Sequence, residues 1–267
     1  MKNIALSRIS ICGANQNTSI AQIIEFLYKC PNANLVIDID SKSCAKGSSL
    51  YNWLKRLNSH LDMEDMYSRI AYRVSGDWAY ELTTEGRFPT ELKKLLYQTP
   101  GFPCIILEIA KDKTHLYTQD PTELSELLDP SYVEPVGMFI LEVNDATKKF
   151  VQKLQRKTNH FEAMYNLADY FSLADCYRHF GVAQNFYGEL NCQNVYMALK
   201  RINDQLKTRT EINLHTKTGL LKGDHKSLDF AKAEQFVNEA NSTADSNLDE
   251  IVPPDADDPW AKYELGE

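Results

Sequence analysis

The sequence alternates regularly between two kinds of segment. Short runs rich in β-branched residues recur along the sequence, and a longer segment with helical spacing of apolar residues follows each of them. Alternation of this kind predicts parallel βαβ units. Seven runs are predicted as strands: Arg8–Gly13, Asn34–Asp40, Ser68–Ser75, Pro103–Ala110, Val136–Asn144, Gln184–Leu190 and Thr210–Thr216. The predicted helices are Ser19–Tyr28, Ser49–Leu57, Pro89–Tyr97, Thr122–Leu128, Thr147–Arg156, Gln193–Leu206 and Ser227–Ala240.

Two α/β architectures contain such units, the closed barrel and the open doubly wound sheet. No GxGxxG or GxxxxGK[ST] pattern follows the first predicted strand, which removes support for a nucleotide-binding open sheet. A body of about 240 residues suits a (β/α)8 TIM-type barrel, which is the fold we predict. We expect its eighth strand to be degenerate, near His115–Gln119, or one βα unit to be missing. Phe161–Phe180 is predicted to be mostly helical.

The net charge of −8 belongs to the end of the chain. Residues 241–267 hold eight acids and one lysine, so the barrel domain predicted at residues 1–240 is nearly neutral. A nearly neutral body argues against nucleic acid as a partner. We expect the polar, acidic tail at 241–267 to be disordered. Trp260 and Tyr263 within it indicate an alternative, a segment that docks on a protein partner or on its own barrel.

The chain has no apolar run near the roughly 20 residues of a membrane span and no signal-peptide pattern, so we predict a cytoplasmic protein without membrane contact. Its six cysteines form no CxxC pair, and the six histidines are scattered. We therefore expect buried free thiols, no metal site and no cofactor. Only His215 among the histidines falls at a predicted strand end.

Ligands of a barrel bind at the carboxyl ends of the strands, and charged residues gather there. Asp38 and Asp40 share one face of their predicted strand, where they serve either acid–base chemistry or a lysine contact and a loop cap. The candidate catalytic residues are Asp38, Asp40, Lys42, Asp77, Lys111, Glu142 and Asp145. Cys12, at the end of the first strand, is a candidate general base or nucleophile, with a core thiol as the alternative.

The segment TKTGLLKGD after the last predicted strand is a second candidate region. Loops that combine glycine, threonine and lysine bind phosphate with backbone N–H groups and a cation. Together with the turn after the seventh predicted strand, it gives the candidate phosphate-binding residues Gly188, Thr216, Lys217, Thr218 and Gly223. Glu189 in that turn has the wrong charge for such a site unless it points away. The alternative is an ordinary polar loop.

Several stretches resemble the (5-formylfuran-3-yl)methyl phosphate synthase family of methanofuran and methylofuran biosynthesis. They are NLVIDIDSKSCAKGSSLYNWL, YRVSGD, FILEVNDATKKFVQKL, HFGVAQNFYGEL and TEINLHTKTGLLKGDHKSLDFAKAEQFV. The resemblance implies a phosphate-binding barrel that condenses two triose phosphates through a lysine Schiff base in C1-carrier cofactor biosynthesis. Asp38 matches the family's second-strand Asp, whereas Asp40 stands where the family has its catalytic lysine. The family's fourth-strand lysine is also absent, and Lys42 and Lys111 are the nearest substitutes.

A second resemblance is to phosphoribosylanthranilate isomerase. SICG at Ser10–Gly13 is similar to that family's first strand, whose cysteine is the general base, and GELNCQNVYMAL is similar to its seventh-strand turn. The paired glycines of the family's phosphate loops are absent, and its substrate-binding arginine is not apparent after the second strand.

Two classes of function follow. The first is a lyase that joins phosphorylated aldehydes, with Lys42 or Lys111 as the amine and the candidate carboxylates as proton carriers; an isomerase of the second family is its enzymatic alternative. The second class is a non-catalytic barrel that acts as a binding or regulatory subunit. The relatives also imply a homo-oligomer.

Overall fold

The computed structural model describes residues 4–101, 103–108, 121–129, 136–144, 147–167, 184–206, 209–223 and 227–246. Eight strands form one sheet: β1 (Ile4–Cys12), β2 (Ala33–Ile39), β3 (Ile70–Val74), β4 (Cys104–Leu107), β5 (Met138–Val143), β6 (Glu162–Asn166), β7 (Gln184–Gly188) and β8 (Thr210–Thr216). The helices of the described residues are α1 (Ile20–Lys29), α2 (Ser49–Met63), α3 (Gly76–Thr84), α4 (Thr90–Tyr97), α5 (Thr122–Leu127), α6 (Lys148–Gln155), α8 (Val195–Gln205) and α9 (Phe230–Asp245).

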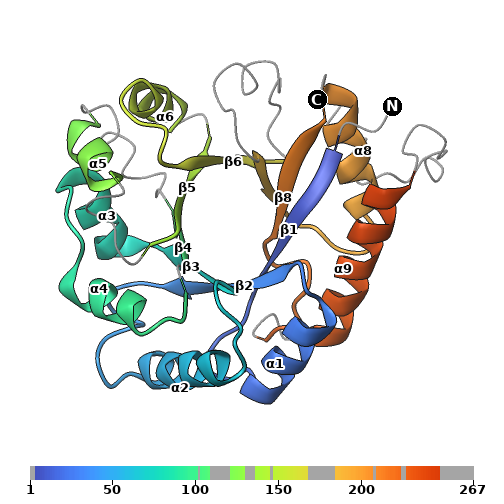
Figure 1. Cartoon of the computed structure of the whole chain (residues 1–267), viewed down its shortest axis with the longest axis horizontal. Coiled ribbons are helices and arrows are strands. Elements are labelled where there is room, and N and C mark those ends of the chain that lie inside the picture. The colour runs from blue at the N-terminus through green and yellow to red at the C-terminus, as the bar shows by residue number, and fades with distance from the viewer. Residues whose placement is uncertain are drawn as a thin grey trace.

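Every strand pairs in parallel with the next, and β8 pairs with β1, so the sheet closes into a barrel. The helices surround the barrel, and Figure 1 looks onto the end where the strands begin. The predicted (β/α)8 TIM-type fold is therefore confirmed. None of the helices in the described ranges is long and apolar enough to cross a membrane.

Local sequence signals place several helices where they were predicted. Ser19 accepts a hydrogen bond from the Gln22 backbone N–H at the start of α1, and Ser48 caps α2 in the same way. Each helix buries one apolar stripe against the outside of the strands, as Ile23, Phe26 and Leu27 of α1 do.

The structure corrects two predictions and adds a helix that was not predicted. The helix predicted over Phe161–Phe180 is wrong over Glu162–Asn166, which form strand β6. With β6 the barrel has eight strands, so no βα unit is missing, and His115–Gln119, where the eighth strand was expected, lies outside the described residues. The residues of β6, EAMYN, include no β-branched side chain, and the strand forms because it closes the barrel between β5 and β7. Helix α3 is an element that the sequence analysis missed. Helix α9 continues through Asp245, five residues beyond its predicted end.

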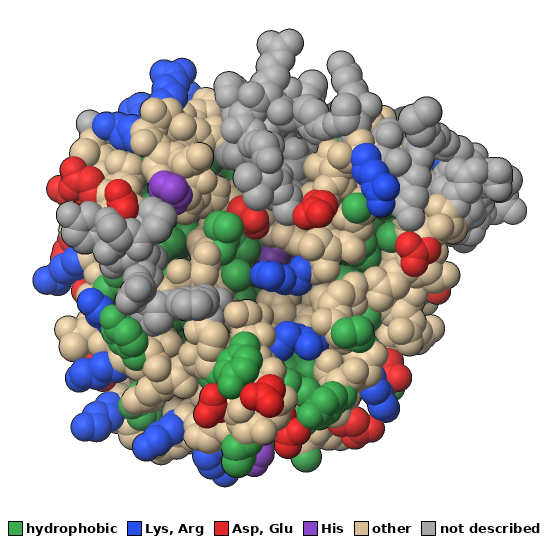
Figure 2. Space-filling model, viewed as in Figure 1, with side chains coloured by type: hydrophobic (Ala, Val, Ile, Leu, Met, Phe, Trp, Pro, Cys, Tyr) green, Lys and Arg blue, Asp and Glu red, His purple; other side chains and the backbone are tan. Residues whose placement is uncertain are grey.

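The inside of the barrel holds an apolar part and a polar part. Side chains that point inward from neighbouring strands form a small apolar cluster: Cys12, Val36, Ala71, Cys104, Ile106, Ile140, Met164 and Tyr187. Toward the amino ends of the strands, polar groups replace them, among them Arg8, Asn185 and Asn213. Figure 2 shows basic, acidic and histidine side chains gathered at the centre of this end of the barrel.

Candidate functional site

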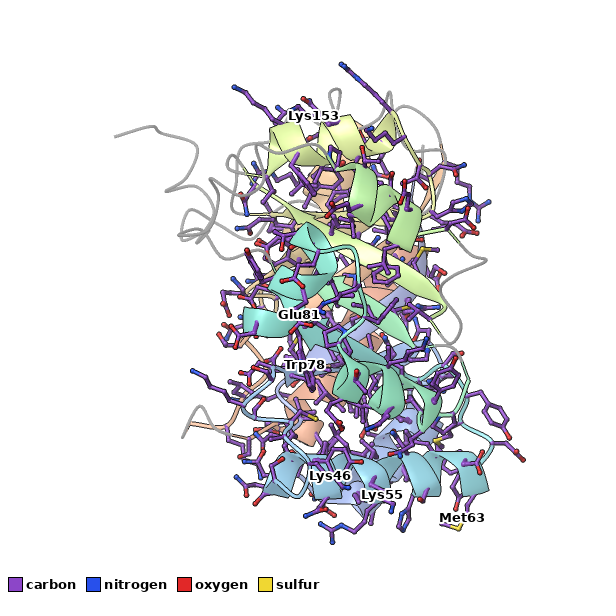
Figure 3. All side chains as sticks on the ribbon, turned by 90° about the vertical axis from the view of Figure 1, so that its left-hand side faces the viewer. Lys46, Lys55, Met63, Trp78, Glu81 and Lys153 are labelled. Carbon is purple, nitrogen blue, oxygen red and sulfur yellow. The ribbon has the colours of Figure 1, made fainter. Side chains whose placement is uncertain are left out.

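The carboxyl ends of the strands form the opposite mouth of the barrel, on the left in Figure 3. Helix α2, which follows β2, begins there near Lys46 and runs along the barrel toward Met63. Lys46 and Lys55 are exposed on the outer side of the molecule. The mouth thus presents strand ends and loops, which is where ligands of this fold bind.

A cavity of about 370 Å³ lies at this mouth, between the loops that follow β1 and β2 and the end of β3. Its lining is Gly13, Ala14, Asn15, Gln16, Asp38, Ile39, Asp40, Ser43, Leu50, Ser75 and Leu221. The predicted common face of Asp38 and Asp40 is therefore a wall of a cavity. Its size matches a small metabolite.

Asp38 does not stand alone at this wall, because Arg73 of β3 binds both of its carboxylate oxygens. Nε lies 2.5 Å from Oδ1, and Nη2 lies 2.8 Å from Oδ2. Glu108, just after β4, lies 4.0 Å from the same Nε. Burial lowers the pKa of Arg73, but the Asp38 hydrogen bond and nearby negative charges outweigh burial and raise that pKa above its usual value. The pair is a fixed bidentate contact. An arginine therefore makes the contact with Asp38 that the sequence analysis assigned to a lysine.

Asp40 has a structural role in the loop that follows β2. Its Oδ1 accepts hydrogen bonds from the backbone N–H groups of Lys42, at 2.7 Å, and Ser43, at 2.6 Å. Burial raises the pKa of Asp40, but the hydrogen bonds from Ser43 and Lys42 lower it by more, so the pKa lies below its usual value. Its carboxylate therefore stays ionised and holds the turn, as the loop-cap alternative predicts.

Two further predicted residues of this region, Lys42 and Asp77, lie at the rim. Lys42 is exposed in the same loop, and Asp77 in α3 accepts a hydrogen bond of 3.2 Å from Ser41 Oγ. Lys111 and Asp145 lie outside the described residues, as do Trp260 and Tyr263 of the tail. The catalytic roles predicted for Lys42, Asp77, Lys111 and Asp145 stay predictions, as does the docking role predicted for the tail.

Across the mouth, Glu142 of β5 and Tyr187 of β7 are hydrogen-bonded through the tyrosine hydroxyl and Glu142 Oε1. Thr147 fixes the backbone beneath Glu142, since its Oγ1 donates to the Glu142 carbonyl at 2.9 Å. The Lys217 ammonium lies over the Tyr187 ring, 5.3 Å from its centroid. Within the described ranges, no carboxylate lies within 4 Å of Lys217 Nζ. The structure thus brings a carboxylate, a phenol and an ammonium group together.

Cys12 ends β1 inside the barrel and is 4% exposed. Burial raises the pKa of its thiol to about 12, and the charges of Arg73 and Lys217 lower it only in part. A thiol with such a pKa is not ionised near neutral pH, so the core-thiol alternative describes Cys12 better than a general base does.

The turns predicted to bind phosphate lie side by side after β7 and β8. The Lys217 backbone N–H donates to the Gly188 carbonyl at 2.9 Å, and Thr216 Oγ1 accepts from the Cys12 backbone N–H at 3.1 Å. The carboxylate of Glu189 points into the turn, where it accepts hydrogen bonds from Thr218. Gly223 lies further along the loop, with no described atom within 4 Å of the position a Cβ would take.

Beneath the mouth, His215 belongs to a buried polar network. Asn185 Nδ2 donates to Glu162 Oε2 at 2.8 Å, so its Oδ1 faces His215 Nε2 at 2.9 Å and Asn213 Nδ2 at 3.1 Å. His215 Nε2 must then carry the proton, which leaves Nδ1 as a buried acceptor without a partner among the described groups. Burial lowers the pKa of His215 to about 3, so the ring is neutral.

Three of these features were missed by the sequence analysis: the Arg73 partner of Asp38, the Tyr187 partner of Glu142, and the buried network around Asn185. The alternation of strand side chains indicates that Arg73 and Tyr187 face the inside of the barrel. Arg73 is two residues from the inward-facing Ala71, and Tyr187 is two residues from Asn185. Spacing alone did not say which partner each would meet.

No protein-family model matches the chain, and no curated protein matches its sequence. Among solved structures, it is similar to a phosphoribosyl anthranilate isomerase in complex with reduced 1-(o-carboxyphenylamino)-1-deoxyribulose 5-phosphate, with 16% identity, a TM-score of 0.51 and coverage of 88% of this chain and 98% of the other. It is also similar to phosphoribosyl anthranilate isomerase from Thermotoga maritima, with 12% identity, a TM-score of 0.51 and the same coverage.

These similarities establish the fold. At such low identity, the activity of this barrel must be argued from its own side chains. The side chains at the mouth include the Asp38–Arg73 pair and the Glu142–Tyr187–Lys217 group. Among the described residues, no cluster of three or more His, Cys, Asp or Glu side chains is arranged to hold a metal ion.

Proposed function

We propose that this barrel is an isomerase of a small, hydroxylated carbonyl compound. The observation that carries the proposal is the hydrogen bond between Glu142 and Tyr187 at the mouth, with the Lys217 ammonium over the tyrosine ring. Glu142 and Tyr187 come from β5 and β7, and Lys217 follows the end of β8, so three separate parts of the barrel converge on one point, as expected for a barrel active site.

An isomerisation next to a carbonyl group moves one proton between two carbons and another between two oxygens. Glu142 is suited to take the proton from the first carbon and to return it to the second. The Tyr187 hydroxyl is suited to donate its proton to the substrate oxygen and to recover one afterwards. Lys217, close to the ring, stabilises negative charge that develops on the phenol or on the substrate oxygen.

The fold neighbours support this class of reaction, since both are isomerases by name. The resemblance of SICG to the isomerase family supports it as well, but with a different base, because the pKa of Cys12 is raised to about 12. The cavity beside Asp38 opens at the same mouth, and its lining includes none of Glu142, Tyr187 and Lys217.

The test is deuterium exchange in D2O with simple aldoses, which carry no phosphate, as probes. We expect the wild type to incorporate deuterium at the carbon beside the carbonyl. Glu142→Gln and Tyr187→Phe should each lower this rate by about 100-fold or more, the usual contribution of a general acid or base. Glu91→Gln, which removes the same charge from an exposed ion pair on α4, is the matched control. Exchange that is unchanged in both variants would refute the assignment.

Lys217 favours a second candidate, the lyase implied by the resemblance to furan phosphate synthases. An imine-forming amine needs a proton carrier beside it, and the Glu142–Tyr187 pair lies next to Lys217. Borohydride trapping with glyceraldehyde 3-phosphate, followed by peptide mass analysis, tests this candidate. An adduct on Lys217 that disappears in Lys217→Arg supports the lyase. An adduct confined to the exposed Lys42 assigns that amine instead, and no adduct in the folded protein removes the lyase.

A further inference from the structure

The turns after β7 and β8 are joined into one wall of the mouth. The Lys217 N–H donates to the Gly188 carbonyl, and Gly219 lies so close to Leu190 that an added Cβ would overlap the Leu190 carbonyl oxygen. Asn194, which is 8% exposed, donates from Nδ2 to the Glu189 carbonyl at 2.9 Å. The backbone on both sides of Glu189 is therefore fixed.

From this fixed backbone, the Glu189 side chain reaches across to the β8 turn. Its Oε2 accepts a hydrogen bond of 3.0 Å from the Thr218 backbone N–H and a second from the Thr218 hydroxyl. A backbone N–H and a neighbouring hydroxyl are the groups with which protein loops bind a phosphate oxygen. In this chain, an internal carboxylate takes the position of that oxygen.

We propose that Glu189 is a specificity-determining residue that closes this wall of the mouth to phosphate. The carboxylate uses both Thr218 donors and adds a negative charge where a phosphate would need a positive one. A ligand that approaches the β8 turn must then present a neutral or cationic group there. Resting on the isomerase proposal, this assigns the substrate to the hydroxylated carbonyl compounds that lack a phosphate at this end.

The sequence pattern predicts a phosphate site at the β8 turn, whereas the structure places a carboxylate there. TKTG has the composition of a phosphate-binding turn, and Thr218 does present its donors to an anion. The anion belongs to the protein, because the residue after Gly188 is Glu189. One side chain therefore decides between a phosphate site and a closed wall.

The experiment measures binding of inorganic phosphate to the full chain by calorimetry and by amide chemical shifts. We expect no saturable binding to the wild type. Glu189→Ala should gain saturable binding at least about tenfold tighter than any wild-type binding, since it frees two donors and removes a like charge. Adding Thr218→Val to Glu189→Ala should remove most of this gain, which assigns the phosphate to the turn.

Two further variants separate donor occupancy from charge. Glu189→Gln loses the charge but still offers an oxygen to Thr218, so it should gain much less than Glu189→Ala. Glu211→Ala removes the same charge from the opposite end of β8 and should match the wild type. Wild-type binding as tight as that of Glu189→Ala overturns the proposal, and so do equal gains in all charge-removing variants or no gain in any.

Binding of phosphate requires no turnover, so this result is independent of the isomerase proposal. A chain without isomerase activity whose Glu189→Ala variant binds phosphate keeps the role of Glu189 and loses only the reaction. A chain that exchanges deuterium but gains no phosphate binding keeps the reaction and loses the role of Glu189.

Discussion

The buried imidazole of His215 predicts a specific loss of stability in mild acid. Burial lowers its pKa from 6.5 to about 3, and the positive charges of Arg8 and Arg73 act in the same direction. In the unfolded chain, His215 therefore binds a proton below about pH 6.5, whereas in the folded chain it binds one only below about pH 3. The stabilising contribution is complete above pH 6.5 and is lost as the pH falls toward 3.

The magnitude follows from the two pKa values. The free energy of unfolding falls by up to about 1.4 kcal/mol per pH unit in this window. Between pH 7.5 and pH 5.0 the loss due to His215 is about 2 kcal/mol. The assay is urea unfolding at both pH values, for the wild type and for His215→Gln, which keeps a side-chain N–H for Asn185.

We expect the wild type to lose about 2 kcal/mol more than His215→Gln between these pH values. Other titrating groups, including Glu162, whose pKa burial raises, are present in both proteins and cancel. His160→Gln removes an exposed histidine and should follow the wild type. An equal pH dependence in the wild type and His215→Gln would refute the claim that the buried ring is neutral.

Three further predictions concern Cys12, the Asp38–Arg73 pair and Gly219. Cys12, with a pKa near 12 rather than 9.0, should react with iodoacetamide at pH 8 roughly a thousandfold more slowly in the folded than in the urea-unfolded protein; equal rates, read by peptide mass, would contradict its burial. Asp38→Asn should lower the free energy of unfolding by about 1–3 kcal/mol, more than Arg73→Met, because the Arg73 side chain that loses its bidentate partner is 20% exposed and that of Asp38 is 59% exposed. The reverse order in urea unfolding would disprove this asymmetry. Gly219→Ala should cost about 1–3 kcal/mol by thermal unfolding because its Cβ meets backbone, whereas Gly223→Ala should change little; equal costs would count against the packed wall.

Much of the fold was predictable because strand periodicity and helix caps are local signals. The predicted range of β8 coincides with Thr210–Thr216, and the predicted β2 differs from Ala33–Ile39 by one residue at each end. Strand β6 was not predictable in this way, since Glu, Ala and Met favour helices and only the gap between β5 and β7 makes EAMYN a strand.

The candidate site was predictable in its residues but not in their partners. The carboxylates of Asp38 and Glu142 were expected at strand ends, where they lie. That Arg73 binds one and Tyr187 the other depends on the registers of β2 with β3 and of β5 through β7, and register is set by the whole barrel. The contact of Glu189 with the Thr218 turn likewise could not be predicted from a local sequence pattern.

The network inside the barrel limits how this protein can change over time. Asn185 contacts Glu162, Asn213 and His215 at once, so a hydrophobic replacement of Asn185 alone leaves a carboxylate, an amide and an imidazole without their shared partner. Each single step away from this set is costly, whereas a joint replacement of all four by well-packed apolar side chains is not. The four positions are therefore expected to vary together in related sequences or not at all, and an alignment of homologues would reveal them as one strongly coupled group.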